Sequence, residues 1–496
     1  MSITTFLFAG FVILVVIGYR WLPQRIKNLW LLLACAVFIF SWSWKFLITL
    51  LVLTLINLIL GKFIADPRHG KKVLWIGIVL NVLALMLFKY SDFYLPALTS
   101  LLTRLGVPIG AGGIQILAPL GISFITVQMI SYLVDIHFGR TKAEEGFVKF
   151  AIYVLYFPKI LAGPIERVKP FISQLDALKK WSGESILQNF ILVIVGLIRK
   201  IIIADTLIAM IPADAFKQPS LYPAPLLALW LLAYTFSIYN DFAGYTNIVR
   251  GISGFLGIEL TNNFNIPYFS RSFSEFWNRW HISLSNWLRD YIYFPLSRML
   301  RKRIPDPNNA VHIIIPPILT MLVSGLWHGV GWNTFLWGGL QGFYLVLERV
   351  VGLRGPRVAM TELPKWRQAI SAMGIFFCIL LAWVPFHTGV IPALHYWWNL
   401  IKIPNWSISV YKAYILATQS GGIPLASLRM IAIFPFFQAA IVLLPALGLD
   451  LVQYKDEFRF RKWPAWLQFV LLALVGLILF LLSFAEKGAP FVYQNF

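Results

Sequence analysis

Two histidines, His281 and His328, are the residues of this chain best suited to chemistry, because each stands beside tryptophan in a hydrophobic sequence. His281 lies within Arg279-Trp-His-Ile-Ser-Leu-Ser-Asn-Trp-Leu-Arg-Asp290, and His328 lies within Gly325-Leu-Trp-His-Gly-Val-Gly-Trp332. A buried neutral imidazole can accept the proton of an attacking hydroxyl group, which is the role of a general base in acyl transfer. The alternative for His328 is a histidine hydrogen-bonded between two helices, and the residues alone leave both interpretations open.

The motifs that accompany other mechanisms are absent from the sequence. It contains no Gly-x-Ser-x-Gly nucleophile motif, and its two cysteines, Cys35 and Cys378, lie in apolar runs away from any histidine in sequence. No His-Glu-x-x-His or similar spacing indicates a metal site. We therefore expect direct acyl transfer, without a covalent acyl-enzyme or a bound cofactor. No residue is assigned to a metal ion, and a His/Asp/Glu cluster of other spacing stays an open alternative.

The first of the two motifs lies in a segment with the spacing of an amphipathic helix. Apolar residues recur three and four positions apart from Phe273 to Tyr291, so the pattern predicts one helix over these residues. Ser272 followed by Glu275 is typical of a capping box at its start, and Pro295 is expected to end it.

The polar side of this predicted helix admits two interpretations. Asn278, Ser285 and Arg289 share one face of the helical wheel, and His281 lies at its border. Such a helix can lie at the membrane interface with its arginines reaching lipid headgroups. It can also form one wall of a polar chamber, and the spacing does not separate the two.

Composition places these motifs in a membrane protein. Of 496 residues, 59% are hydrophobic and only 13% are charged, which is far less charge than a soluble protein of this length carries. Repeated apolar runs long enough to cross a bilayer predict an all-α polytopic membrane protein. The net charge of +21 lies mainly between those runs, where topology signals and lipid headgroups account for it, so nucleic acid is not an expected partner.

We predict about eleven membrane-spanning helices, with re-entrant or interfacial helices between them. Arg20, Arg25 and Lys27 follow the first apolar run and place that end of it in the cytoplasm. Arg199 and Lys200 are unusual inside an apolar run, where either two short helices meet or the pair faces a wet cavity. Several of the expected spans cover residues 1–18, 29–42, 44–60, 73–88, 371–387, 425–447 and 466–484.

Together, the two motifs resemble those of the membrane-bound O-acyltransferase family. The bacterial branch that they resemble holds alginate O-acetylation membrane proteins and the D-alanyl transfer membrane protein of teichoic acids. The resemblance covers residues 115–345 in consistent order, which is more specific than a single short motif. Further segments that carry it are Pro119-Leu-Gly-Ile-Ser-Phe124, Ser131-Tyr-Leu-Val-Asp135, Phe157-Pro-Lys-Ile-Leu-Ala-Gly-Pro-Ile165 and Tyr239-Asn-Asp-Phe-Ala-Gly-Tyr-Thr246.

The resemblance implies a fold. In the family, helices form a ring around a central funnel, where a histidine meets an acyl thioester. For this chain we expect three parts of one continuous membrane domain. Residues 1–114 would form N-terminal transmembrane helices, 115–349 the O-acyltransferase core, and 350–496 the C-terminal transmembrane helices.

The same resemblance implies roles for residues. His328, at the Trp-His-Gly position, and His281 are implied as the catalytic residues, with His281 shaping the site or orienting the acceptor. Several of the weaker candidates can equally be structural ion pairs or contacts between helices. The candidates for substrate binding are Asp241, Arg279, Ser285, Asn286, Arg289, Asp290 and Trp327.

The function implied is transfer of an acyl group, with acetyl expected, from a cytoplasmic thioester donor toward a cell-envelope polysaccharide. The donor is acetyl-CoA or an acyl-carrier thioester, which the basic cytoplasmic loops would suit. The branch usually hands its acyl group across the membrane to a separate extracytoplasmic acyltransferase, so the implied partner is such a transferase or the glycan acceptor. The location implied is the bacterial cytoplasmic (inner) membrane, and alginate or another exopolysaccharide is the kind of acceptor.

Three alternatives stay open. D-alanyl transfer to teichoic acid is the nearest, although a length of 496 residues favours the polysaccharide-acetylating members. A transporter or channel would also carry polar residues inside the membrane, but no repeated halves are visible in the sequence. An inactive scaffold would be expected to tolerate the loss of His328.

Overall fold

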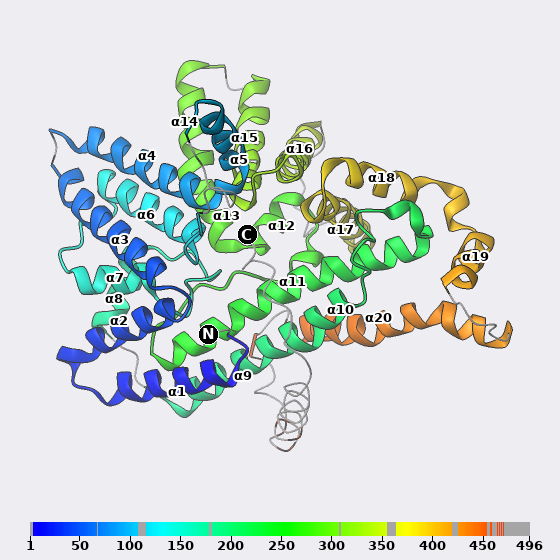
Figure 1. Ribbon diagram of the computed structural model, residues 1–496, viewed down its shortest axis with the longest axis horizontal. Coiled ribbons are helices and arrows are strands. Elements are labelled where there is room, and N and C mark those ends of the chain that lie inside the picture. The colour runs from blue at the N-terminus through cyan, green and yellow to red at the C-terminus, as the bar shows by residue number, and fades with distance from the viewer. Residues whose placement is uncertain are drawn as a thin grey trace. The chain divides into compact units, whose positions relative to one another are not determined.

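The computed structural model of the protein consists of helices in the part of the chain that it describes (Figure 1). That part runs from residue 3 to residue 470, apart from 67, 108–115, 178–180, 307–308, 355–363, 419–424, 454–456, 459–463, 465, 467 and 469. Within it, the one β-type pairing is an isolated antiparallel bridge between Phe264 and Trp280. The prediction of an all-α protein is therefore confirmed for the described residues.

The first of two structural units comprises Met1–Val193 and Thr246–Asn262. Its helices are α1 (Phe6–Trp21), α2 (Gln24–Phe40), α3 (Trp44–Ile64), α4 (Gly70–Lys89), α5 (Ser91–Arg104), α6 (Ile122–His137), α7 (Phe147–Leu155), α8 (Val168–Asp176), most of α9 (Gly183–Leu197) and the end of α11 (Ala224–Phe255). Helix α3 packs against α4, α6 and α7. Asn57 on α3 and Asn81 on α4 exchange amide hydrogen bonds of 3.1 and 2.7 Å, which hold these two apolar helices together.

The second unit comprises Ile194–Tyr245 and Asn263–Phe496, and it contains both candidate histidines. Its helices are η1 (Ile198–Ala204), α10 (Asp205–Ala209), η2 (Pro219–Leu221), the first part of α11, η3 (Pro267–Phe269), α12 (Phe273–Arg279), α13 (Ile282–Leu288), η4 (Arg289–Tyr293), α14 (Phe294–Arg303), α15 (Ala310–His328), α16 (Trp332–Arg354), α17 (Lys365–His387), α18 (Val390–Ile401), η6 (Ile403–Trp406), α19 (Ile408–Thr418) and α20 (Leu425–Gln453). Helix α16 packs against α15, α12 and α17, so these four helices surround the region of His328.

The hairpin formed by α15 and α16 positions the end of α15. Its two helices lie side by side (Figure 1), and glycine residues face the contact. A Cβ atom at Gly325 of α15 would overlap the carbonyl oxygen of Thr334, and one at Gly338 of α16 would overlap that of Met321. The absence of side chains at these two positions therefore lets the helix backbones approach closely, and the turn of α15 at Gly325 lies level with residues 334–338.

Six helices among the described residues are long and apolar enough to cross a membrane. Expected spans at 44–60, 73–88 and 371–387 fall within three of them. The expected span at 466–484 lies almost entirely outside the described residues, and the total of about eleven stays a prediction. The six are Trp44–Ile64, Gly70–Lys89, Ala224–Phe255, Ala310–His328, Lys365–His387 and Ile433–Gln453.

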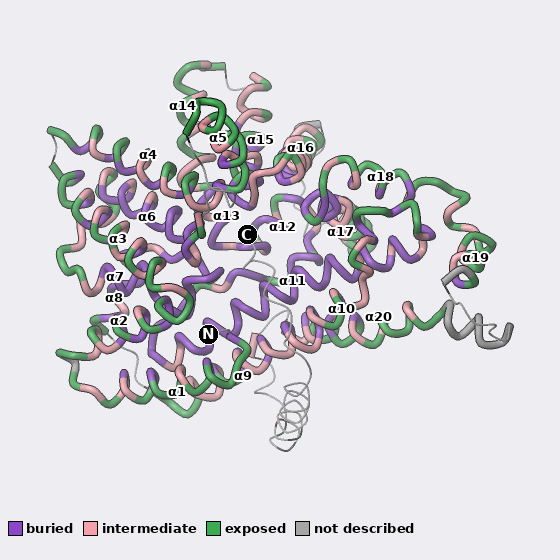
Figure 2. Tube along the Cα trace, in the orientation of Figure 1, coloured by how far each residue is buried: buried purple, intermediate pink, exposed green. Residues whose placement is uncertain are grey.

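Helix α11, with 32 residues, is buried along most of its length (Figure 2). Its first part belongs to the second unit and its end belongs to the first. Asn240 and Asp241 lie in the first part and are both buried. Polar side chains inside a membrane protein avoid lipid by facing protein partners. The burial of α11 therefore explains why its apolar run tolerates Asn240 and Asp241.

Candidate active site

The segment around His281 is not the single helix that its periodicity predicts. The backbone between α12 and α13 pairs with a neighbouring loop: the Asn265 amide donates to the Arg279 carbonyl at 2.9 Å. Likewise, the Ile282 amide donates to the Asn263 carbonyl at 3.0 Å. These hydrogen bonds to residues 263–265 break the helical pattern at His281, so the prediction of one continuous helix is wrong.

His281 has a backbone φ of 42°, in the left-handed region that residues other than glycine seldom occupy. Such strain persists only where the surrounding structure over-determines it, and it clusters at functional sites. The side chain is 1% exposed, and its ring meets that of Phe242 at right angles, with 4.8 Å between centroids. Burial lowers the pKa of His281 to about 3, so its ring is neutral at physiological pH.

The predicted start of this segment is confirmed in part, and its predicted end is wrong. Ser272 Oγ accepts the Glu275 amide at 3.0 Å, as in a capping box. The Glu275 carboxylate, however, accepts the amide of Arg271 at 2.7 Å, one residue before the position that a capping box requires. The π-helical turn η4 leads directly from α13 into α14, whose first turn contains Pro295. Proline is tolerated there because the first amides of an α-helix need no acceptor within it.

His328 is the last residue of α15 and is 2% exposed. The helix ends there, and α16 begins only at Trp332. The His328 ring meets those of Trp327, Trp337 and Phe386 at centroid distances of 4.9, 5.3 and 5.4 Å. Aromatic side chains from α15, α16 and α17 thus enclose the imidazole.

The two histidines belong to one aromatic cluster. Trp327 meets His328 at 4.9 Å and His281 at 6.1 Å between ring centroids. The tryptophan that the sequence predicts as a substrate-binding residue therefore lies between the two predicted catalytic residues. This arrangement supports a shared site, although the role of each residue stays a prediction.

Three aromatic residues of this cluster were missed by the reasoning from sequence: Trp337, Trp383 and Phe386. Trp383 stacks on Trp337 at 6.0 Å and meets Trp280, the neighbour of His281, at 5.0 Å. Trp337 could have been found from its place in the span that follows the Trp-His-Gly motif. Nothing near Trp383 or Phe386 in the sequence points to the site, because only the packing of α17 on α16 brings them there.

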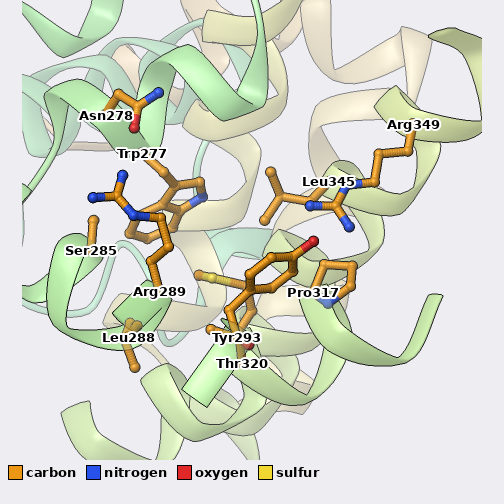
Figure 3. A pocket seen from close by; sticks show the side chains of 11 residues that line it. Trp277, Asn278, Ser285, Leu288, Arg289, Tyr293, Pro317, Thr320, Leu345 and Arg349 are labelled. Atoms are coloured by element: carbon orange, nitrogen blue, oxygen red, sulfur yellow. The ribbon is translucent and has the colours of Figure 1, made fainter. Parts of the chain in front are cut away.

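A cavity of about 150 Å³, which we name the arginine cavity, is lined by residues of α12, α13, η4, α15 and α16 (Figure 3). Asn278, Ser285 and Arg289, which the helical wheel places on one face, all line it. Figure 3 shows Arg289 and Arg349 on opposite sides of the cavity, with Tyr293 between them. The shared face predicted by the helical wheel is therefore present, and the choice between headgroup contact and a polar chamber stays open. The remaining lining residues are Trp277, Leu288, Pro317, Thr320, Met321 and Leu345.

The arginine cavity combines positive charge with apolar walls. Arg349 lies 5.1 Å from the centroid of the Tyr293 ring, and Arg289 Nε forms a long ion pair of 3.7 Å with Asp290 Oδ1, without a hydrogen bond. Both guanidinium groups are thus able to bind an anionic group. Trp277 in the cavity wall meets Trp337 at 6.0 Å, so the cavity adjoins the aromatic cluster of the histidines.

Other predicted substrate-binding residues contact neighbours within the protein. Asp241 Oδ1 lies 2.8 Å from Lys200 Nζ, and both side chains are buried. Arg279 Nη2 lies 2.6 Å from Glu275 Oε1. Asn286 is half-buried on α13. These contacts favour structural roles for Asp241 and Arg279, and the predicted binding roles of all three residues stay predictions.

Arg199 and Lys200 lie where two helices, α9 and α10, meet, which is one of the two expectations for the apolar run that contains them. The π-helical turn η1 carries both, and both are buried. Arg199 Nη2 lies 2.6 Å from Asp450, while Lys200 Nζ lies 2.8 Å from both Asp205 and Asp241. Carboxylates from α10, α11 and α20 therefore neutralise the two cations, which is why the apolar run tolerates them.

These features define a class, that of polytopic helical membrane proteins whose candidate site joins buried histidines to a basic cavity. Residues 142–387 match the membrane-bound O-acyltransferase family. A probable alginate O-acetylase of Pseudomonas aeruginosa is 33% identical over 415 residues, which cover 82% of this chain and 76% of that protein. The chain belongs to the membrane-bound O-acyltransferase family and is a membrane O-acyltransferase.

Two further relatives are named for acceptors other than alginate. A peptidoglycan O-acetyltransferase of Helicobacter pylori is 31% identical over 422 residues, which cover 78% of this chain and 76% of that protein. A teichoic acid D-alanyltransferase of Streptococcus thermophilus is 27% identical over 336 residues, which cover 65% of this chain and 77% of that protein. The family and the acyltransferase activity predicted from the sequence are thus confirmed.

Proposed function

We propose that this enzyme transfers an acetyl group from a cytoplasmic thioester toward a cell-envelope polysaccharide. The relatives at 33% and 31% identity are named for O-acetylation, of alginate and of peptidoglycan, whereas the D-alanyltransferase is 27% identical. The observation that carries the mechanism is the position of His328, buried at the end of α15 among aromatic rings. A polysaccharide of the alginate kind is the acceptor that these relatives favour.

His328 acts as the general base in this proposal. Its imidazole takes the proton of the acceptor hydroxyl as that oxygen attacks the thioester carbonyl carbon. The tetrahedral intermediate then collapses, the carbon–sulfur bond breaks, and the departing thiolate takes the proton from the imidazolium. One thioester and one alcohol thus give one ester and one thiol without an acyl-enzyme. The aromatic enclosure of His328 supports this role, because it keeps out water that would hydrolyse the thioester.

His281 orients the acceptor. Its buried neutral ring can donate one hydrogen bond and accept another, which suits a sugar hydroxyl group. The left-handed backbone at φ 42° supports this role, because it turns the chain sharply between α12 and α13 and fixes where the ring lies.

The donor binds through the arginine cavity. A phosphopantetheine arm, of coenzyme A or of an acyl carrier, has a phosphate for Arg289 and Arg349 and an uncharged chain for the apolar walls. Along α15, Thr320 in the cavity wall is followed at four-residue intervals by Ser324 and His328. These positions follow one side of the helix over about 12 Å, a distance that such an arm can cover.

Replacing Arg289 or Arg349 by glutamine is expected to raise the KM for the donor about 10-fold, with a smaller effect on kcat. A charge-assisted hydrogen bond contributes about 1.5–3 kcal/mol, and the exposure of Arg289 favours the lower end. Initial rates of the purified enzyme in liposomes, with acetyl-CoA or an acetylated carrier protein, measure the effect. Arg301→Gln, exposed on α14, is the matched control. If KM stays unchanged in both cavity variants, the donor does not enter there.

The identity of the acyl group is tested in cells that carry or lack this chain. Cells with the chain are expected to bear ester-linked acetate on their extracted envelope polysaccharide, and cells without it are expected to lose that acetate. Mild alkali releases the ester-linked groups for quantification. Loss of ester-linked D-alanine in place of acetate would show that the acetyl assignment is wrong, whereas no change in either ester would favour a transporter or scaffold.

We also propose that about eleven spans form a ring around a central funnel in the bacterial cytoplasmic membrane. Arg20, Arg25 and Lys27, at and after the end of α1, support a cytoplasmic location for that end. The acyl group then passes to a separate extracytoplasmic acyltransferase or directly to a glycan acceptor. Labelling of single introduced cysteines with a membrane-impermeant maleimide from each side tests this topology.

A further inference from the structure

Trp337 carries a buried indole N–H group for which the described residues offer no hydrogen-bond acceptor. The side chain is 1% exposed, and its ring meets that of His328 at 5.3 Å with an interplanar angle of 88°. A buried donor without a partner is costly and uncommon in native proteins. Its place beside the proposed general base points to an acceptor that arrives with the substrate.

Other buried polar atoms around Trp337 also lack a partner in the described part of the chain. They are Ser324 Oγ, one turn before His328, Gln341 Oε1, one turn after Trp337, and Trp383 Nε1. All three side chains are 1% exposed or less. Because the α15 turn at Gly325 lies level with residues 334–338, Ser324 and Trp337 occupy the same level of the hairpin. Buried donors and acceptors without partners are uncommon, and those gathered here could bind a polar group of the substrate.

We propose that the Trp337 indole N–H donates a hydrogen bond to the carbonyl oxygen of the donor thioester and stabilises the oxyanion that forms there. The proposal rests on the proposed function, because it assumes acyl transfer at His328. When the acceptor oxygen adds to the carbonyl carbon, the π electron pair moves onto the carbonyl oxygen. That oxygen keeps the negative charge until the pair re-forms the carbonyl and the thiolate leaves with the proton held by His328.

An indole suits this role for two physical reasons. Its nitrogen donates but does not accept, so it cannot compete with His328 for the proton of the acceptor. Its ring is also held in place on two sides, by stacking on Trp383 and by an edge contact with Trp277, each at 6.0 Å. A donor that is fixed before the reaction needs no reorganisation as charge develops, which is the condition for effective oxyanion stabilisation.

The experiment replaces Trp337 by 3-benzothienylalanine, in which sulfur takes the place of the indole N–H with little change in shape. We expect kcat to fall on the order of 100-fold, as when one oxyanion donor is removed, with the donor KM and the unfolding temperature unchanged. The same replacement at Trp230, which is 5% exposed on α11 and meets Tyr222 instead of the histidines, is the matched control and is expected to leave kcat within a few-fold. Isotope-edited infrared spectra of a bound acetyl thioester should show a higher carbonyl stretching frequency in the Trp337 variant than in the natural protein.

Three outcomes overturn the proposal. If the Trp337 replacement keeps the natural kcat while His328→Ala is inactive, the indole is not the oxyanion donor, and the proposed function stands. If kcat falls only together with the unfolding temperature and the carbonyl frequency does not move, Trp337 has a packing role alone. Full activity of His328→Ala would instead remove the proposed function, and the role of Trp337 with it.

Discussion

Replacing His328 by alanine is expected to remove ester-linked acetate from the envelope polysaccharide while the protein remains in the membrane at its normal level. General-base catalysis contributes roughly 10²- to 10⁴-fold, so the purified variant should lose on the order of 10³-fold in kcat. The donor KM should change little, because our proposal assigns donor binding to the arginine cavity and not to the imidazole. Acetate quantification, membrane protein level and initial rates measure the three quantities.

A loss of activity in His328→Ala can come from a destabilised fold as well as from the missing base, since alanine leaves a gap among the rings that surround His328. His328→Gln keeps a polar side chain of similar size but cannot act as a base near neutral pH, so it should be as inactive as the alanine variant. His312→Gln, near the other end of α15, is the matched control, because His312 bonds only to a nearby carbonyl of Ile304 among the contacts described. Normal acetate in both His328 variants would contradict the catalytic assignment and favour transport or scaffolding.

The sequence identifies the histidines but not their surroundings. The glycine residues at 325, 329 and 331 would allow a break in the helix near His328, and α15 does end at this residue. The break at His281 could not be predicted, because it depends on backbone hydrogen bonds to residues 263–265, which helical periodicity does not report. Trp383 lies far along the chain, so only the packing of α17 on α16 brings it to the cluster.

The partners of buried charged residues could not be predicted from the sequence either. The apolar run around Lys200 indicates that its charge needs a special environment, but local sequence cannot say which one. The carboxylate partners come from α10 and α11, so their identity is a property of the tertiary structure. Asp241, a predicted substrate-binding residue, is one of those partners. A motif position alone therefore does not distinguish a residue that binds substrate from one that stabilises the fold.

Replacing Lys200 by methionine distinguishes these roles and is expected to destabilise the protein strongly. Lys200 is 2% exposed and lies 2.8 Å from the carboxylates of Asp205 and Asp241. Without the ammonium group, the buried Asp241 carboxylate loses this cation, and breaking one side of a buried pair costs about 3–5 kcal/mol. The membrane level and the unfolding temperature in detergent should therefore both fall clearly.

Adding Asp241→Asn to Lys200→Met should restore much of this stability, because it removes the buried charge that the lysine neutralised. If Asp241 has only a structural role, the double variant that reaches the membrane should also keep its kcat. Asp241→Asn by itself should be mild, since Lys200 keeps Asp205 as a partner. A folded Asp241→Asn variant with a greatly raised KM would instead place Asp241 in substrate binding. Rates expressed per folded molecule decide between the two, because a structural carboxylate changes the amount of enzyme and a binding carboxylate changes its kinetics.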